Sequence, residues 1–421
     1  MELTNEKLSS LAICQQNQSS NGFDSLRAAG WAAFAENAWP GRKDEEYKFT
    51  ALDQLISKKF DFSTVSSRQS LDSSVKNKFY TVEGYHLVFD NGNYRDDLSI
   101  VPSGDLKIRS FDSLDKTELN DVIKKAKDSR ATVSINQAFL SNGLVLSLGK
   151  SASALPVFIY HFNGSDSASI SFPRMHIEAS ENSHIRCYER CFNVSKSHFA
   201  SSVTTFDVAR NASIRFTKIQ DFGKSDVMLD NMFVEQEADS HFFANTFSLS
   251  GGLIRNNLEI AINGEHSEAN MYGLYLLDGQ SHVDNHTVVD HKFPNCNSNE
   301  LYKGIVDEQA TAVFNGKIFV RQEAQKTNAF QANNNVSLSD QATIHTKPQL
   351  EIWADDVKCS HGCTIGQLDE EALFYLKSRG IKPATAMAML LNAFAEETLA
   401  NVQLEEINKE IVDMIHKRLD A

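Results

Sequence analysis

Residues 182–214 read NSHIRCYERCFNVSKSHFASSVTTFDVARNASI, and the pattern that opens this stretch returns at its end. In both places small polar residues precede the first apolar residue of a strand-like run, Ile185 and then Ile214. The pattern recurs beyond the stretch, before Phe242 and before Met271. Equating these four apolar residues predicts a repeat of about 29 residues.

Two folds are compatible with this repeat. Short strands with small residues at the turns, repeated about every 30 residues, suit one coil of a parallel β-solenoid. Successive hairpins of a large antiparallel sandwich give a similar spacing, so the residues alone leave both folds open. Val313 and Ile344 extend the repeat toward the end of the strand-like region, which begins near Tyr80 and reaches Ile352.

Helical periodicity marks both ends of the chain. Ala28 to Ala35 predict a helix that Asp24 or Ser25 caps and that ends before Pro40. The serine-rich segment 63–74 is interpreted as a loop, and amphipathic helices are predicted after Leu368. We therefore predict an N-terminal helical segment over 1–80, a β core over 81–365 and a C-terminal helical domain over 366–421.

Composition excludes several function classes. The 421 residues contain 55 acidic and 41 basic side chains, a formal charge of −14 that disfavours nucleic acids and anionic membranes. No apolar run approaches the roughly 18 residues of a membrane span, and the start at Met1 lacks the pattern of a secretory leader. We expect a cytoplasmic protein whose six cysteines are free thiols or ligands.

The densest cluster of reactive side chains covers residues 355–363, read DDVKCSHGC. Cys359, His361 and Cys363 offer thiolate and imidazole, which suit iron or zinc. Lys358 is expected to lower the pKa of the Cys359 thiol. The spacing does not complete a structural zinc site, so the alternatives are an incomplete metal site or a polar turn with incidental thiols.

Two further clusters are weaker candidates. Cys187 and Cys191, near His184, would share one face of a strand, but buried free cysteines are common in apolar cores. Residues 143–151 resemble a P-loop only at their end, because five residues separate the glycines and Pro156 blocks the helix that must follow. We therefore reject nucleotide binding by this segment.

A histidine-rich stretch, residues 281–291, supports a rival function. His282, Asp284 and His286 would lie on one strand face, while His291 falls beyond them. Such a face could bind a metal in a β-solenoid hydrolase, or it could be a polar face held by stacked hydrogen bonds. The hydrolase predicts metal binding and turnover by the isolated chain.

Residues 302–381 carry motifs that closely resemble the SufB/SufD family of iron–sulfur cluster assembly proteins. These motifs are Tyr302-Lys303-Gly304-Ile305, Phe314-Asn315-Gly316-Lys317-Ile318, Lys347-Pro348-Gln349-Leu350-Glu351-Ile352, Cys359-Ser360-His361-Gly362 and Phe374-Tyr375-Leu376-Lys377-Ser378-Arg379-Gly380-Ile381. The segment 45–50, EEYKFT, is similar to the N-terminal element of the SufD branch. Cys363 departs from the family, which is expected to have a small residue there.

The resemblance implies a right-handed parallel β-helix between two helical segments. It implies a scaffold subunit that pairs with SufB and docks the ATPase SufC through C-terminal helices, with no enzymatic activity of its own. Cys359 and His361 would lie at the SufB interface where a nascent cluster forms, His361 as an iron ligand or proton handler, and no cofactor would stay on the isolated chain. A purely structural brace for SufB remains an alternative, and homodimer formation and flavin binding stay open.

Docking on SufC is assigned to the apolar side of the C-terminal helices. Their amphipathic faces could equally pack on their own domain. The residues predicted to dock are Leu373, Leu376, Met389, Leu390 and Phe394.

Overall fold

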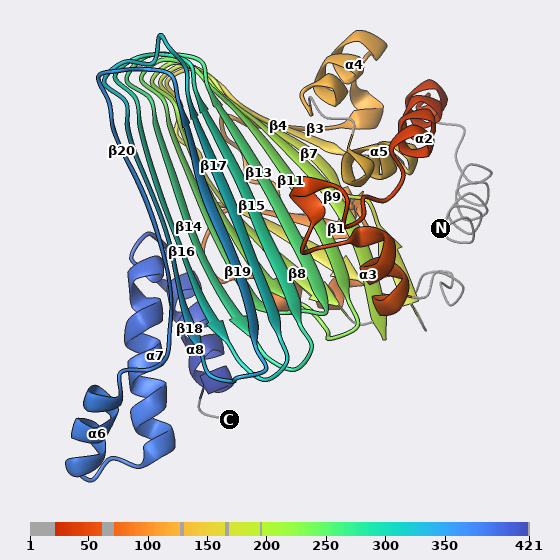
Figure 1. Cartoon of the computed structure of the whole chain (residues 1–421). Helices are drawn as coiled ribbons and strands as arrows, with labels where there is room; N and C mark the ends of the chain where they lie inside the picture. The colour runs from red at the N-terminus through yellow and green to blue at the C-terminus, as the bar shows by residue number, and fades with distance from the viewer. Residues whose placement is uncertain (1–21, 61–70, 127–129, 165–167, 194–195, 420–421) are drawn as a thin grey trace.

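The strands form a parallel β-solenoid of two facing sheets, seen in a computed structural model that describes residues 22–60, 71–126, 130–164, 168–193 and 196–419 (Figure 1). From β7 and β8 onward, successive strands alternate between the sheets and pair in parallel with the strand one coil earlier. This topology confirms the solenoid and excludes the antiparallel sandwich.

Each sheet is named here by its last strand. The β20 sheet contains β2 (Asn93–Tyr94), β1 (Tyr85–Asp90), β5 (Val157–Asn163), β8 (His184–Asn193), β10 (Ser213–Asp221), β12 (His241–Ser250), β14 (Glu268–Leu277), β16 (Asn297–Val306), β18 (Asn328–Ser337) and β20 (Lys358–Gly366). The β19 sheet contains β3 (Leu106–Ser110), β4 (Leu144–Leu148), β7 (Arg174–Ala179), β9 (Ser197–Val208), β11 (Val227–Gln236), β13 (Leu253–Ile262), β15 (His282–His291), β17 (Thr311–Val320) and β19 (Thr343–Ile352), with β6 (Ala168–Ser171) beside β9.

The strand register confirms the first repeats and corrects the later ones. Ile214 pairs with Ile185 on one side and with Phe242 on the other, as predicted. Phe242 pairs with Ala269, so the choice of Met271 was wrong by two residues. Ile344 pairs with Ala312, not with Val313. Coil length therefore varies, because turns of different length can join strands whose ladders stay in register.

The small polar residues before the strands are explained by the turn that joins the sheets. Asn182, Asn211 and Asp239 occupy the same corner of successive coils with φ of 61°, 54° and 60°. Asparagine and aspartate adopt this left-handed conformation more readily than other residues with a side chain. The Asn211 side-chain amide also donates to Oδ1 of the Asn182 side chain over 2.8 Å, which links neighbouring turns.

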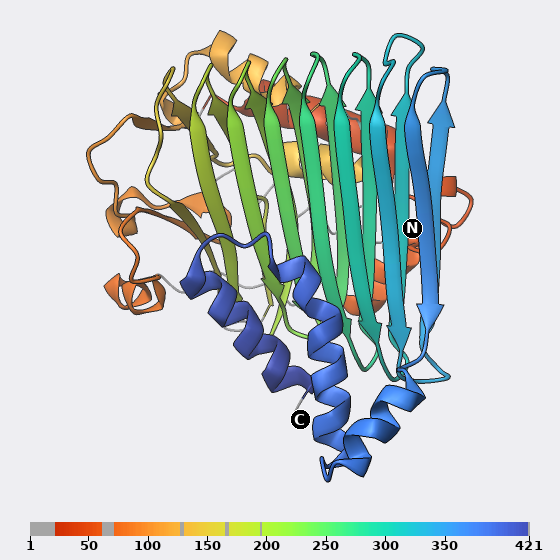
Figure 2. The same cartoon turned by 90° about the vertical axis from the view of Figure 1, so that its left-hand side faces the viewer.

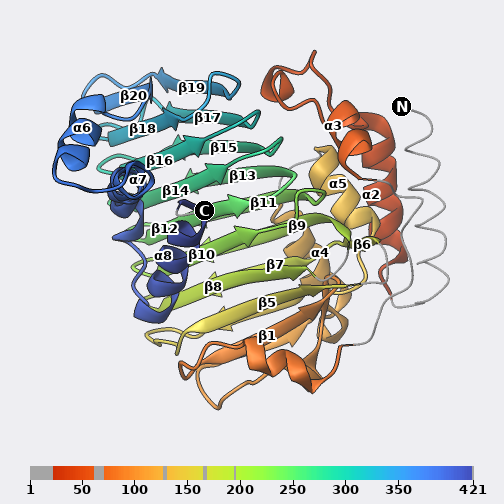
Figure 3. The same ribbon diagram turned by 90° about the horizontal axis from the view of Figure 1, so that it is seen from below.

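Helices cover the outer faces of the two sheets. Helices of the N-terminal half lie against the β19 sheet, and those of the C-terminus lie across the β20 sheet (Figures 2 and 3). The helices are α2 (Asp24–Asn37), α3 (Leu52–Lys59), α4 (Lys116–Lys124), α5 (Ala131–Ala138), α6 (Glu370–Ser378), α7 (Pro383–Leu399) and α8 (Glu405–Leu419), with short 3₁₀ turns that include η1 (Glu45–Tyr47), η3 (Ser73–Lys78), η4 (Asp96–Leu98) and η5 (Phe111–Ser113).

Of two local predictions about the N-terminal segment, one is wrong and the other concerns a segment mostly outside the described residues. The N-cap of α2 is Phe23, without a side-chain cap, so capping by Asp24 or Ser25 was wrong. Asp24 instead pairs with Arg27 over 2.6 Å. The serine-rich segment predicted as a loop lies mostly outside the described residues, and its last part, from Ser73, belongs to η3.

Candidate functional site

Within the part of the chain that the structure describes, no strand pairs with the last coil of the solenoid. The β20 and β19 strands each end their sheet with one unpaired edge. Every residue of β19 and β20 is half-buried or exposed, whereas the preceding strands β17 and β18 contain many fully buried residues. This open end is defined here by β19 and β20 together with the interior side chains that the last coil leaves accessible.

The predicted Cys/His cluster lies on the open end. Cys359, His361 and Cys363 occupy alternate positions of β20, so their side chains leave the same face of the strand. Cys359 packs against the interior core, which identifies this face as the one that lines the solenoid. The cluster is therefore on a strand, and the alternative of a polar turn is wrong.

The three side chains of the cluster differ in their exposure to solvent. Cys359 is half-buried, whereas His361 and Cys363 are exposed. Burial raises the pKa of the Cys359 thiol, while a hydrogen bond with the Ala329 backbone opposes that rise. The expectation that Lys358 lowers this pKa was wrong, because adjacent residues of a strand point to opposite faces.

Exposed apolar side chains gather on the same coil. Large side chains at Ile352, Trp353 and Ile365 are 40%, 49% and 54% exposed, and Phe330 on β18 is 44% exposed. Apolar side chains beside two bare strand edges are characteristic of a surface that another protein covers.

The second cysteine pair belongs to the core. Cys187 and Cys191 lie on one face of β8, as predicted, and both are buried among apolar side chains. Burial raises the pKa of each thiol well above its usual range, so neither is a reactive thiolate. His184 is exposed at the start of the strand and does not join them. Cys14, the sixth cysteine, lies outside the described residues.

The histidine-rich stretch is a structural polar face. His282, Asp284 and His286 share one outer face of β15, but the N-terminal segment covers them. The His282 ring lies 3.0 Å from the Thr50 hydroxyl, and Asp284 accepts a hydrogen bond from Arg255. Arg255 also approaches Nδ1 of His286 at 2.7 Å.

These contacts leave no free lone pair on His286. The guanidinium of Arg255 can only donate, so Nδ1 of His286 must accept, and Nε2–H donates to Glu46 over 2.7 Å. The imidazole is thus neutral, in agreement with burial, which lowers its pKa. A metal-dependent hydrolase centred on this triad does not fit the structure.

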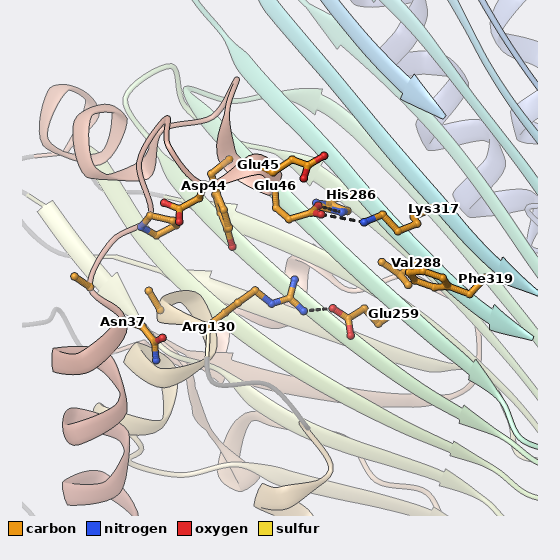
Figure 4. A pocket seen from close by; sticks show the side chains of 14 residues that line it. Asn37, Asp44, Glu45, Glu46, Arg130, Glu259, His286, Val288, Lys317 and Phe319 are labelled. Atoms are coloured by element: carbon orange, nitrogen blue, oxygen red, sulfur yellow. Dashed lines mark hydrogen bonds and ion pairs between the residues drawn. The ribbon is translucent and has the colours of Figure 1, made fainter. Parts of the chain in front are cut away.

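A cavity of about 520 Å³ adjoins this face, between the N-terminal segment and the β19 sheet (Figure 4). Glu46 projects over it and pairs with His286 and with Lys317, the latter over 3.1 Å. The His286 hydrogen bond is the largest cause that lowers the pKa of Glu46 to about 2. Arg130 and Glu259 pair on the cavity's other side. Glu46 and Glu259 thus both have partners within the chain, and the contacts of Glu46 fasten the N-terminal segment to the sheet.

Only part of the apolar surface of the C-terminal helices packs against the β20 sheet. In α7, buried Leu391 and Ala395 contact the β20 sheet together with half-buried Phe394, whose ring lies 4.7 Å from the Lys303 ammonium. Met389 is 47% exposed, and Leu390 is half-buried.

Helix α6 lies away from both sheets and has no buried residue (Figures 1 and 2). Its Leu373 and Leu376 are half-buried, whereas Phe374 is 72% exposed and Tyr375 is 56% exposed. Large aromatic side chains left in solvent on a projecting helix are characteristic of interaction surfaces. Docking at this helix, and the identity of what docks there, stay predictions.

Two features are absent from the described residues. No group of three or more histidine, cysteine or acidic side chains in them is arranged to hold a metal ion. In the same residues no helix is long and apolar enough to cross a membrane.

Taken together, the fold and the site define a class of protein: a parallel β-solenoid, covered by helices, whose uncapped end presents thiols and an imidazole. The family model for the SUF system FeS cluster assembly SufBD core domain matches residues 161–394, and the chain belongs to the SufB/SufD family.

Relatives align over most of their length. The iron–sulfur cluster assembly protein SufD of Escherichia coli is 31% identical over 392 residues, which cover 90% of this chain and 89% of the relative. An iron–sulfur cluster assembly SufBD family protein of Synechocystis is 31% identical over 388 residues, covering 87% and 85%. A chloroplastic protein of Arabidopsis thaliana is 27% identical over 401 residues, covering 91% and 83%. The chain thus has a role in iron–sulfur cluster assembly.

Sequence reasoning missed the polar side chains inside the solenoid. Glu300 and Gln331 are buried in the interior, behind the open end. The available signal was the glycine content of the strands, since Gly304 and Gly316 stand in strand-like runs without a turn to explain them.

Proposed function

We propose that this chain is a SufD-like scaffold subunit that pairs with SufB through the open end. Terminal coils of a solenoid need a cap, and here the described residues provide none for β19 and β20. A Cβ added at Gly362 would meet no atom of this chain within 4 Å, so the chain itself does not require glycine there. Close approach by another backbone is a reason for glycine at such a place.

The pairing would complete a cluster-building site. Cys359 supplies a thiolate and His361 an imidazole nitrogen, with Cys363 as a further soft ligand, and SufB supplies the rest. Half of a coordination shell on each subunit lets the nascent cluster leave, because separating the ends removes ligands from it. A closed four-thiolate cage would retain the product.

The helical tail would dock the ATPase SufC. Leu373, Leu376, Met389, Leu390 and Phe394 were assigned to this surface, and exposed Phe374 and Tyr375 extend it. Nucleotide hydrolysis would belong to SufC, whose movement the tail passes to the solenoid. This chain would then be a scaffold subunit and not an enzyme.

Three further properties complete the proposal. The chain carries no permanent cofactor, and the iron and sulfur of the nascent cluster are cargo. In the absence of SufB, two copies of the chain can pair through the same open ends, giving a homodimer. The chain works in the cytoplasm.

The decisive experiment is anaerobic cluster formation in the reconstituted assembly with SufB and SufC. We expect His361→Ala to reduce cluster formation at least 10-fold, measured as bound iron and acid-labile sulfide. His184→Ala is the matched control, since His184 is an exposed histidine of the same sheet far from the open end. Full activity of His361→Ala would remove this residue from the mechanism.

The same assay separates the scaffold from a purely structural brace. A brace tolerates Cys359→Ser but loses activity when the surface around Met389 is disrupted. An isolated chain that binds a full complement of iron, or that shows no affinity for SufB, would contradict the proposal as a whole.

A further inference from the structure

Two lines of polar side chains run inside the solenoid and end on the predicted cluster. Glu300, Gln331 and His361 are register partners on β16, β18 and β20, so their side chains leave the same face of the sheet. Neighbouring strands lie about 4.8 Å apart, which brings successive side chains of a line into contact range. The second line contains Tyr302, Asn333 and Cys363.

Glycines make room for these polar groups. A Cβ at Gly316 would lie 2.0 Å from Nε2 of Gln331, and one at Gly273 would lie 2.2 Å from the ring of Tyr302. Neither glycine has a positive φ, so backbone conformation does not require them. The interior is thus shaped around Gln331 and Tyr302.

Hydrogen bonds fix one end of the Gln331 side chain. Its Nε2 donates to Glu300 over 2.7 Å, and the Thr287 hydroxyl donates to the other oxygen of Glu300 over 2.6 Å. The Gln331 side chain is 3% exposed, and its Oε1 has no hydrogen-bond partner among the described residues. A buried acceptor of this kind is costly unless something donates to it.

The next donor along the line is the imidazole of His361. A histidine that binds metal through one nitrogen usually donates its other N–H to a carbonyl or carboxylate, which fixes the tautomer and the ring orientation. Gln331 offers such a carbonyl one strand behind His361, and its amide direction is set by Glu300.

We propose that Gln331 and Glu300 position His361 for iron: when SufB covers the open end, the His361 N–H donates to Oε1 of Gln331 and the other ring nitrogen faces the cluster. Glu300 acts through Gln331, because its oxygen holds the amide nitrogen and thereby turns the carbonyl toward the open end. Both are positioning residues. This inference rests on the proposed function and adds two residues to it.

The test uses the full chain in the assembly with SufB and SufC. Gln331→Met keeps the volume but removes the acceptor, and we expect it to slow cluster formation about 10-fold. Gln220→Met is the matched control, since Gln220 is a buried glutamine on β10 whose amide donates to Asn256 and takes no part in this line. Gln331→Met at the wild-type rate, beside an inactive His361→Ala, would overturn the inference and leave the proposed function standing.

A swapped pair excludes a merely structural role. The double variant Glu300→Gln with Gln331→Glu keeps the hydrogen bond between the two side chains but places a carboxylate beside His361. The carboxylate accepts the His361 N–H as the amide carbonyl does, so the acceptor lost in Gln331→Met is restored. We expect the double variant to recover most of the rate lost in Gln331→Met. A folded double variant that binds SufB but stays as slow as Gln331→Met would refute the positioning role.

Discussion

The two ends of the solenoid are built differently. At the first end, β2 pairs antiparallel with β1, and β3 pairs antiparallel with β4, so each sheet begins with a strand that reverses the direction of the ladder. At the other end both sheets stop at a parallel strand with a bare edge. Terminal repeats of a solenoid need capping, which is why we propose that a partner covers the second end.

The interiors behind the two ends differ as well. Behind the first end inward Leu87 is apolar and fully buried, and inward Glu189 pairs with Lys218 over 3.3 Å. Behind the open end the inward positions include Glu300 and Gln331. Buried polar side chains are costly unless they are fully hydrogen-bonded, and Oε1 of Gln331 has no partner among the described residues. This incompletely bonded polar group stands next to the predicted chemistry.

The largest expected effect tests the capped end. Leu106→Ala in β3 removes a buried side chain from the core and should lower the free energy of unfolding by about 3 kcal/mol. Leu350→Ala in β19 is the matched change at the open end, where the side chain is only half-buried, and should cost about 1 kcal/mol. Urea denaturation of the isolated chain measures both. Equal losses would show that the open end is packed as firmly as the capped one.

The second prediction concerns the polar interior. Burial raises the pKa of Glu300 to about 7, so the folded chain holds this proton more tightly than the unfolded chain does. Stability from this group is complete below about pH 4.5 and is lost as pH rises to about 7, a change on the order of 3 kcal/mol.

Glu300→Gln removes the titration. The difference in unfolding free energy between variant and wild type should therefore shift in the variant's favour between pH 4.5 and 7, measured by urea denaturation at several pH values. Glu189 is also buried, but its partner Lys218 lies 3.3 Å away, and it is the same in both proteins. A difference that does not change with pH would mean that Glu300 titrates normally.

The third prediction compares apolar side chains of the two ends. Ile365→Asp at the open end should weaken SufB binding at least 30-fold, about 2 kcal/mol, if this side chain is buried at the centre of the interface. Ile100→Asp is the control, because Ile100 is 44% exposed near the capped end. Calorimetry or interferometry with purified SufB measures both affinities. If Ile365→Asp and Ile100→Asp bind SufB with equal affinity, the SufB interface does not lie at the open end.

How much of the structure the sequence predicts depends on whether the interactions that decide it are local or lie between distant residues. The turn pattern around Asn182 and Asn211 predicted the coil because a left-handed corner has a local preference that a single residue expresses. The later register was missed at Met271, since only the ladder itself decides which residue of a longer or shorter coil faces Phe242. Cys359 and His361 could be singled out because their chemistry is rare and their spacing is local, and their role in the site stays a prediction.

The line Glu300–Gln331–His361 could not be found in this way. Its members lie a coil apart, and nothing local distinguishes an inward glutamate from an outward one. The same limit explains the His282 stretch, whose partner Thr50 comes from the distant N-terminal segment. A metal site and a fastening surface have the same composition in sequence, and only the contacts tell them apart.

The smallest expected effect concerns that fastening. Glu46 binds His286 and Lys317, and the pKa of its carboxyl is lowered to about 2, so it stabilises the fold above pH 4.5 and ceases to do so as pH falls toward 2. The side chain is 38% exposed, so solvent screens the pair and Glu46→Gln should cost no more than about 1 kcal/mol at pH 7.

Glu45→Gln is the matched control, because Glu45 is 72% exposed and pairs with Lys347 on the surface. Limited proteolysis of the segment around η1 should speed up in Glu46→Gln at pH 7 and remain near the wild-type rate in Glu45→Gln. The difference between Glu46→Gln and wild type should shrink as acid protonates the wild-type carboxyl. If both variants behave alike, the N-terminal segment is held by the packing of Tyr47 and its apolar neighbours, and the buried histidine face does not fasten it.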